Sequence, residues 1–563
     1  MQSVAAGSIV MTPTSTAPST DNTSPPKHAK ASPWAPFGYA SFTVLWIATV
    51  VSNVGTWMHD VGAGWLMTEL DPSPSVVAMV QAATTLPVFL FALLAGAVAD
   101  IVDRRKLLIL VNLLMGAVAT GLAVVVHLEV MTPWLLIAFT FAMGTGAAFV
   151  APAWQAIVPK LVDRKDLSSA IALNSMGINV SRAIGPALAG FLIVSVGIAM
   201  PFALNTLSFV GIVIALIWWR SPASPAATLP REHVGEAIRA GLRYAINSGP
   251  VRATLVRAAF FFIFASAYWA MLPLIARDVL AGGATLYGLL LASVGAGAVL
   301  GALILPSIRA RFGANGTVAL GTLGTAIAMA SFALPPQAGL AAAASALAGV
   351  SWIAVLSSLH VSAQTALPDW VRARGLSVFL TIFFGAMAAG SLIWGQVASR
   401  LSIEMALLIA AGGAVAFVPL TWAAKLGQGE ALNLAPSSHW PEPVLSEGAD
   451  DTSGPVMIQI TYHVGVDDHP AFETLMVRMG QARRRSGAYR WSLMQDAETP
   501  DRFVETWFEP SWADHLRHHG RVTESARALQ DQVKALTSNE PSVSHYLTRR
   551  PKTQTPVSKG DLQ

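Results

Sequence analysis

The chain has 563 residues, of which 53% are hydrophobic and only 12% are charged, and its formal net charge is +4. Soluble domains carry about 25% charged residues, so this composition predicts a membrane protein with several spans. The sequence contains no cysteine, which excludes disulfides, thiol catalysis and cysteine-based metal sites. The polar residues are concentrated toward the two ends of the chain.

The first 35 residues are rich in Ser, Thr, Pro and Ala. Such a composition cannot form a core, so residues 1–35 are predicted to be a disordered N-terminal tail. We expect no cleavable signal peptide, because the tail is long and the first apolar run exceeds the length of a signal-peptide core.

Twelve apolar runs follow this tail. A run of about 18 or more apolar residues is typical of a membrane-spanning helix. Because their number is even, both ends of the chain are predicted to lie on the same side of the membrane. The runs cover about 37–66, 75–99, 107–128, 133–152, 168–195, 199–219, 256–280, 285–306, 315–335, 338–362, 376–399 and 402–424.

Basic residues are distributed unevenly between the turns that join these runs. One set of alternate turns contains little beyond Arg277 and Arg400. Cytoplasmic loops carry the excess of Lys and Arg, so the other set is predicted to face the cytoplasm together with both termini and the middle segment. We therefore expect a multi-pass protein of the inner (plasma) membrane. The other set contains Arg104, Arg105, Lys106, Lys160, Arg164, Lys165, Arg309, Arg311, Arg372 and Arg374.

An internal repeat divides the runs into two groups of six. The pattern Q-x-x-x-P-x-x-V-x-x-x-x-L-S begins at Gln155 and again at Gln364, 209 residues later. The first copy lies between the fourth and fifth runs, and the second between the tenth and eleventh. Parallel repeats of six spans are typical of one class of secondary transporters. The sequence thus predicts two six-helix halves, at 36–219 and 256–425.

The turn after the second run reads GAVADIVDRRK and includes Gly96, Asp100, Asp103, Arg104 and Arg105. It resembles the loop between the second and third helices of the major facilitator superfamily. The resemblance implies that this loop is a cytoplasmic latch between the two halves. The alternative is a role in topology alone, because any short inner loop needs cations.

Several polar residues fall inside the predicted spans. A charge near mid-membrane costs ~2.5–3.5 kcal/mol on insertion scales, so Arg182 in the fifth span is expected to face a cavity or a counter-charge. Asp60 in the first span is a candidate counter-charge or proton carrier, and His59 a candidate proton relay. The alternative places both at the outer mouth, in water. Asn53 and Asn179 are further candidates for proton coupling or substrate binding.

Small residues and proline follow Arg182 in the fifth span. Gly185, Pro186 and Gly190 resemble a motif of the exporter branches of the superfamily, in which it is associated with antiport. Glycine permits close approach of helices, and proline removes a backbone hydrogen bond and bends the helix. A role in packing alone is the other interpretation.

The stretch Thr56–Trp65, followed by Pro72–Pro74, resembles one branch of the superfamily. That branch contains an enterobactin exporter and many transmembrane secretion effector proteins, and the resemblance covers about 37–425. It implies proton-driven efflux of a small hydrophobic or amphipathic molecule, such as a drug, siderophore or secondary metabolite. The sequence has no G-x-x-x-x-G-K-[ST] pattern, so ATP is not expected to be the energy source.

Two polar segments connect these halves to each other and to the end of the chain. Residues 220–255 are predicted to form a cytoplasmic linker helix, either amphipathic on the membrane surface or solvated. Residues 426–455 read as a linker, 456–549 as a cytoplasmic domain and 550–563 as a disordered tail.

The predicted order β-α-β-β-α-β makes 456–549 a ferredoxin-like domain. It resembles the domains of the antibiotic-biosynthesis-monooxygenase type, which usually pair as dimers. We expect Trp491 and Trp507 in its core. The histidines His515, His518 and His519 are at helical spacing and are expected on a solvated helix face rather than at a metal site.

The predicted fold is therefore an all-α polytopic membrane protein of about twelve helices with a small α+β domain. The predicted function is proton-coupled secondary transport, not enzymatic catalysis, with the lipid bilayer, a small-molecule substrate and a proton gradient as partners. We expect no cofactor, metal or nucleic acid, and we expect pairing through the C-terminal domain. In the alternative, the C-terminal domain is a cofactor-independent monooxygenase or a dimerising regulator of a membrane-tethered protein.

Overall fold

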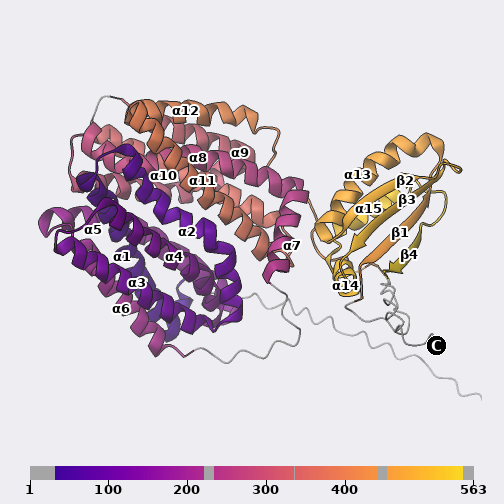
Figure 1. The fold of residues 1–563 in the computed structure, drawn as a ribbon, viewed down its shortest axis with the longest axis horizontal. Coiled ribbons are helices and arrows are strands. Elements are labelled where there is room, and N and C mark those ends of the chain that lie inside the picture. The colour runs from indigo at the N-terminus through magenta and orange to yellow at the C-terminus, as the bar shows by residue number, and fades with distance from the viewer. Residues whose placement is uncertain are drawn as a thin grey trace, which may run out of the picture.

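The computed structural model describes residues 32–220, 234–334, 337–427, 429–437, 439–440 and 453–548. The tail predicted for 550–563, and all but the last few residues of the tail predicted for 1–35, lie outside this part. A bundle of long helices forms one body, and a sheet with three helices forms a second, smaller body (Figure 1).

The first six-helix group runs from α1 to α6, and the second from α8 to α12. The first group comprises α1 (Ala40–Leu70), α2 (Pro74–Ile101), α3 (Arg104–His127), α4 (Pro133–Ile157), α5 (Leu167–Ser195) and α6 (Met200–Trp218). The second comprises α8 (Gly249–Leu274), α9 (Ala284–Phe332), α10 (Ala338–Thr365), α11 (Arg372–Arg400) and α12 (Ile403–Leu420). Between them, α7 (Val234–Asn247) lies beside the C-terminal domain (Figure 1).

Helix α9 accounts for two spans. Within the described residues, eleven helices are long and apolar enough to cross a membrane. Helix α9 has 49 residues, and its backbone leaves the helical region at Gly313, where φ is 64° and ψ is −178°. Glycine tolerates a positive φ, so the chain turns there and crosses back. Ten single spans and one double span confirm the predicted twelve.

The surface of the bundle is apolar. Leu113 on α3 is 53% exposed and Leu303 on α9 is 72% exposed. Large exposed apolar side chains around the whole bundle are costly in water and are expected where lipid is the solvent. This surface, with the twelve spans, makes the protein a multi-pass membrane protein.

The spans alternate, so the turns gather at two ends of the bundle. The charged end holds the turns at 102–103, 158–166 and 366–371, and the opposite end holds those at 71–73, 280–283 and 401–402. The two halves approach closely toward the opposite end. A methyl group on Gly395 would lie 2.6 Å from the Cβ of Ala78, and one on Gly288 would lie 2.5 Å from the Pro186 carbonyl oxygen. Helices α2 and α11, and α5 and α9, thus seal the halves at the opposite end.

The C-terminal domain has the predicted ferredoxin-like order, with the second helix broken after Arg521. Its antiparallel sheet has the order β2-β3-β1-β4, and its helices cover one face. Alternate residues of β1, from Val456 to Tyr462, are buried against those helices. The elements are β1 (Val456–His463), α13 (His469–Ser486), β2 (Tyr489–Gln495), β3 (Arg502–Glu509), α14 (Trp512–Arg521), α15 (Glu524–Lys534) and β4 (Ser542–Leu547).

A strap, formed by residues 426–427 and 429–437, ties this domain to the second half. At its start, the Leu426 amide donates to Asn315 Oδ1 at 2.9 Å. At its end, the Ser437 amide donates to the Val522 carbonyl at 2.9 Å. Helix α7 packs against both α11 and α13. The domain is therefore mounted on the second half at the charged end.

Candidate transport site

A cavity of about 210 Å³ lies between the two halves. Helices α1, α2 and α5 of the first half and α8 to α11 of the second half supply its walls. The cavity thus involves the first, fifth, seventh and eleventh spans, among others. Its charged and polar lining residues are Asp60, Gln81, Thr84, Thr85 and Arg182, and its aromatic lining residues are Trp57, Trp269, Tyr287, Trp352, Phe383 and Phe384.

Asp60 lies half-buried on α1 and lines this cavity. Helix α1 continues for ten further residues to Leu70, so Asp60 lies within the helix rather than at its end. An ionised carboxylate at this depth costs free energy unless it is paired or solvated by the cavity. Asp60 is therefore the acidic group of the site.

Arg182 on α5 lines the same cavity. Its Cζ lies 5.5 Å from the centroid of the Trp57 ring, and its Nε is buried without a hydrogen-bond partner among the described residues. A desolvated cation over an indole face gains about 2 kcal/mol. Within the described part of the chain, Arg182 and Asp60 make no ion pair shorter than 4 Å. Both charges thus remain available to a bound molecule.

His59 lies outside the cavity. Its side chain is only 1% exposed, and its ring packs edge-on against Phe202 of α6 at 5.2 Å between centroids. Neither ring nitrogen has a hydrogen-bond partner among the described residues. Adjacent residues on a helix point about 100° apart, so His59 faces α6, away from the cavity that Asp60 lines and away from water.

The two asparagines lie away from the cavity lining. Asn53 is half-buried on α1, about two turns before Asp60. Asn179 on α5 donates from Nδ2 to the Ser175 carbonyl, 2.9 Å away in its own helix. The geometry therefore brings Asp60 and Arg182 together and leaves Asn53, Asn179 and His59 outside the site.

The second half contributes a continuous aromatic wall. The ring centroids of Trp269 and Trp352 are 5.4 Å apart, and those of Trp352 and Phe383 are 6.0 Å apart. Phe384 follows at 4.5 Å from Phe383. Offset and edge-to-face packing favours flat apolar partners. The sequence prediction missed this wall, although aromatic side chains within otherwise aliphatic spans are a signal that could have revealed it.

The family model described as transmembrane secretion effector matches residues 31–553. The chain belongs to this family. It is a transporter of the major facilitator fold, and the predicted resemblance is confirmed. Its relatives include enterobactin exporters of Shigella boydii serotype 4 and of Escherichia coli, each 26% identical over 341 residues, which is 60% of this chain and 80% of the relative.

Solved structures show the same fold for the transmembrane part of this secretion effector. A mutant of the nucleoside transporter NupG superposes with a TM-score of 0.57 and 13% identity, covering 68% of this chain and 99% of that chain. A bacterial homologue of the iron transporter ferroportin, in the inward-facing state, has a TM-score of 0.52 and 17% identity, covering 68% and 97%. At these identities the likeness establishes the fold.

The predicted latch lies at the charged end of this transporter. Asp103 caps α3 by accepting from the Lys106 amide at 3.0 Å, and Arg104 Nε donates to the Ala99 carbonyl at 3.2 Å. Arg105 donates to the carbonyls of residues 216 and 217, at 2.7 Å each, and so caps the end of α6. A side chain on Gly96 would meet open space. The side chain of Asp100 lies outside the described part.

The small residues of α5 lie at two helix crossings. A methyl group on Gly185 would lie 2.5 Å from the Trp57 Cβ, so this glycine lets α1 approach α5 beside Arg182. A methyl group on Gly190 would lie 2.8 Å from the Ala284 carbonyl oxygen, so this glycine lets the halves close. Pro186 lies between them, and its carbonyl faces Gly288.

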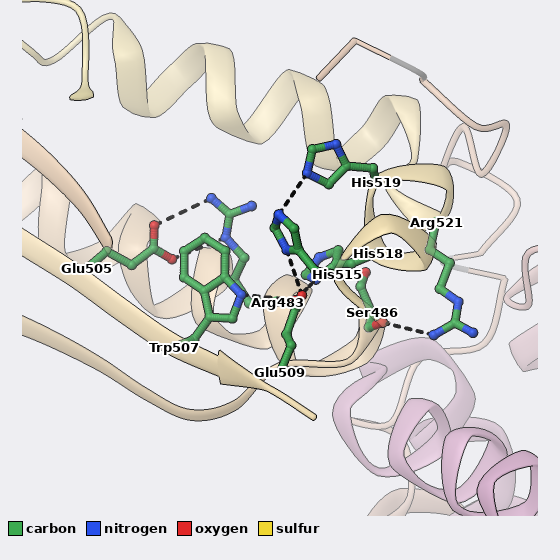
Figure 2. Close-up of polar contacts among 9 residues, drawn as sticks. All are labelled: Arg483, Ser486, Glu505, Trp507, Glu509, His515, His518, His519 and Arg521. Atoms are coloured by element: carbon green, nitrogen blue, oxygen red, sulfur yellow. Dashed lines mark hydrogen bonds and ion pairs between the residues drawn. The ribbon is translucent and has the colours of Figure 1, made fainter. Parts of the chain in front are cut away.

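The histidines of the C-terminal domain contradict the expected solvated face. His515 and His518 are 1% and 2% exposed, and their Nδ1 atoms both donate to the Glu509 carboxylate, His515 at 2.8 Å (Figure 2). Helix α14 follows β3 directly, so these rings lie over Glu509, the last residue of β3. Burial raises the pKa of Glu509, but the facing His518 and His515 outweigh burial and bring that pKa well below its usual range.

The two tryptophans lie on the helix-covered side of the sheet. Trp507 is 1% exposed, and Trp491 packs against the same core. Trp491 also donates from Nε1 to Glu505 at 2.8 Å, whereas Trp507 donates to Glu509 at 3.1 Å. The expectation that both belong to the core is confirmed, and both also bond buried carboxylates.

Proposed function

We propose that this secretion effector is a proton-coupled exporter of a small planar amphipathic molecule and works by alternating access. The observation that supports this most is the shared cavity, in which Asp60 and Arg182 face an aromatic wall. Flat rings favour a flat apolar body, and the two unpaired charges favour polar groups on it. The relatives named as enterobactin exporters support export of a molecule of the siderophore kind.

The coupling step we propose is competition for Asp60. Ionised Asp60 accepts hydrogen bonds only, so a substrate hydroxyl or amine binds it directly. A proton on the same carboxylate removes both its charge and one acceptor position. Substrate and proton therefore exclude each other, which is the requirement for antiport. Arg182, whose Cζ lies 5.5 Å from the centroid of the Trp57 ring, adds a positive charge to the same cavity.

We further propose that the charged end faces the cytoplasm of an inner membrane. The turns rich in Lys and Arg gather there, as the positive-inside tendency requires. Both termini and the C-terminal domain then lie in the cytoplasm. The close packing of α2 with α11 and of α5 with α9 closes the outer end, which supports an inward-open conformation.

The test is transport in inside-out membrane vesicles, with enterobactin as the first probe and simpler planar phenols after it. An acid interior should drive uptake, because protons leave as substrate enters. A protonophore should reduce the uptake to the level of vesicles without the protein. Uptake that the protonophore leaves unchanged would refute proton coupling, and absence of uptake for every probe would refute the substrate class.

We also propose that two copies pair through the open face of the C-terminal sheet. The ring centroids of Tyr489 and Phe508 lie 5.9 Å apart there, and Met494 and Tyr546 are exposed beside them. Because the chain has no cysteine, a single Thr506→Cys substitution at the centre of this face should cross-link two copies. Ala528→Cys on α15 is the control. Equal cross-linking of both variants would contradict this pairing.

A further inference from the structure

The C-terminal domain contains a cavity of about 660 Å³, separate from the transport site. It lies between the helix-covered face of the sheet and helices α13, α14 and α15. This volume is in the range of pockets that bind small molecules, about 300–1,000 Å³. Trp440, Trp507, Trp512 and Tyr462 supply flat walls, and His515, His519 and His545 supply imidazoles.

The charges at this cavity are already paired within the protein. Arg483 Nε lies 3.2 Å from Glu505 Oε1, and both side chains are buried. Lys534 Nζ lies 3.2 Å from Glu540 Oε1 at the rim. Burial, with His515 and His518 close by, lowers the pKa of His519 to about 4, so this ring is neutral at pH 7. Among the described lining residues, a charged ligand would therefore find no unpaired opposite charge to offset the free-energy cost of its desolvation.

Aromatic rings flank the buried guanidinium of the cavity. The Arg483 Cζ lies 4.4 Å from the Trp507 ring centroid and 5.1 Å from that of Trp440. These rings thus hold fixed positions on the cavity wall, where a planar ligand can stack on them. Val543 on β4 lines the cavity and is also 53% exposed, so we infer that the cavity opens to solvent beside this residue.

Helix α14 connects this cavity to the transmembrane part. His515 and His519 line the cavity, and Arg521 at the end of the same helix donates from Nη1 to the Ser486 carbonyl at 3.4 Å (Figure 2). The Arg521 Cζ lies 4.4 Å from the ring centroid of Trp370. Trp370 belongs to the turn at 366–371 that precedes α11, and α11 carries Phe383 of the transport cavity.

We propose that this cavity is a regulatory site that binds a neutral planar aromatic molecule, and that its occupancy shifts α14 and, through Arg521 and Trp370, the turn before α11. The term regulatory rests on the proposed transport function, but the binding and the shift do not. Ligand packed against His515 and His519 changes the position of a helix only ten residues long. The contact of Arg521 with Trp370 transmits that change to the charged end of the second half.

Hydrogen-exchange mass spectrometry of the full chain in detergent tests this site, with 2-naphthol as the neutral probe and 2-naphthoate as its charged analogue. We expect 2-naphthol to slow exchange at 512–521 and at 366–371. We expect 2-naphthoate to give the same protection only at a roughly tenfold higher concentration, a difference in binding free energy of about 1.4 kcal/mol. Because exchange is measured at 512–521, protection there distinguishes binding at this site from probe that enters the transport cavity or the detergent.

One matched pair of variants and one further substitution sharpen the test. Val543→Trp should fill the opening and abolish the protection, whereas Ser542→Trp, the next residue on the other face of β4, should leave it unchanged. Arg521→Gln should retain protection at 512–521 but lose it at 366–371. Full protection in Val543→Trp, or equal potency of the two probes, would overturn the site. Unchanged exchange at 366–371 in the parent chain would overturn the coupling.

Discussion

Arg182 lies over the face of Trp57, with its Cζ 5.5 Å from the ring centroid, and Gly185 one turn later lets the two helices approach closely enough for this contact. The cation is thereby stabilised inside the membrane without an ion pair to Asp60. Since a paired arginine would occupy the only carboxylate of the cavity wall among the described residues, this contact leaves Asp60 free for protons and substrate.

Removal of the charge on Asp60 should uncouple transport. Asp60→Asn keeps the size of the side chain but cannot ionise, so we expect proton-driven uptake into inside-out vesicles to fall by roughly tenfold or more, the scale of about 1.4 kcal/mol. The control is Asp71→Asn at the end of the same helix, where an amide oxygen can still accept from the Ser73 amide. Normal uptake by Asp60→Asn would contradict our assignment of the proton site.

Two substitutions of Arg182 should distinguish the contribution of its charge to transport from that of its stacking on Trp57. Arg182→Ala loses both, and we expect uptake to fall at least as far as in Asp60→Asn. Arg182→Lys keeps the charge but lacks the planar face that stacks on Trp57, so we expect intermediate uptake. Arg277→Ala, in the π-helical segment Ile275–Val279 near the opposite end, should transport normally. Uptake by Arg182→Lys equal to that of the parent chain would show that the stacking contact has no role.

Gly190 should be needed for closure between the halves. A side chain there would overlap the Ala284 carbonyl, which a methyl group would approach to 2.8 Å. Overpacking of this kind costs about 1–3 kcal/mol, so Gly190→Val should favour an outward-open form. Labelling of a single cysteine at Thr285 from the outside should accelerate. Gly211→Val meets no neighbour within 4 Å and should leave the labelling rate unchanged.

Acid should loosen the C-terminal domain. Burial lowers the pKa of His518, and its imidazole neighbours lower that of Glu509, so both groups bind protons less readily folded than unfolded. A lowered folded-state pKa gives stability that is lost as the pH falls. Below the ordinary histidine pKa of about 6.5, protection at 502–521, measured as the exchange rate corrected for its intrinsic pH dependence, should therefore fall. His518→Gln should weaken this dependence, and an unchanged dependence would contradict it.

The buried pair of Arg483 and Glu505 should be essential to this domain. Glu505→Gln would leave a buried guanidinium uncompensated, and breaking such a pair costs about 3–5 kcal/mol. We expect residues 456–548 to unfold at a lower denaturant concentration, and hydrogen exchange measures that midpoint. Asp496→Asn, which alters the exposed pair with Arg502, should change that midpoint little. Similar midpoints in both variants would contradict the importance of burial.

Local rules account for most of what the sequence predicted. The length of each apolar run predicts a membrane span, and the excess of Lys and Arg on alternate turns predicts which turns lie on the same side of the membrane. Gly313 divides α9 where the sequence expected a break between spans. The alternation of β1 and the break after Arg521 likewise depend on residues close together in the chain.

The sites depended on contacts between distant segments. The aromatic wall from Trp269 to Phe384 forms only because α8, α10 and α11 meet. The aromatic side chains in these spans are visible in the sequence, but that they meet in one cavity is not. The histidines of α14 have the spacing of a solvated face, yet Glu509 lies beneath them because β3 ends there.

The sequence by itself thus determined the twelve spans, their division into halves and the ferredoxin-like domain, since burial in lipid and strand alternation are properties of short stretches. Only the tertiary structure decided that Asp60 shares a cavity with Arg182 while His59 faces Phe202. Neighbouring residues on one helix point in different directions, and which direction leads to a cavity depends on the helices packed around it.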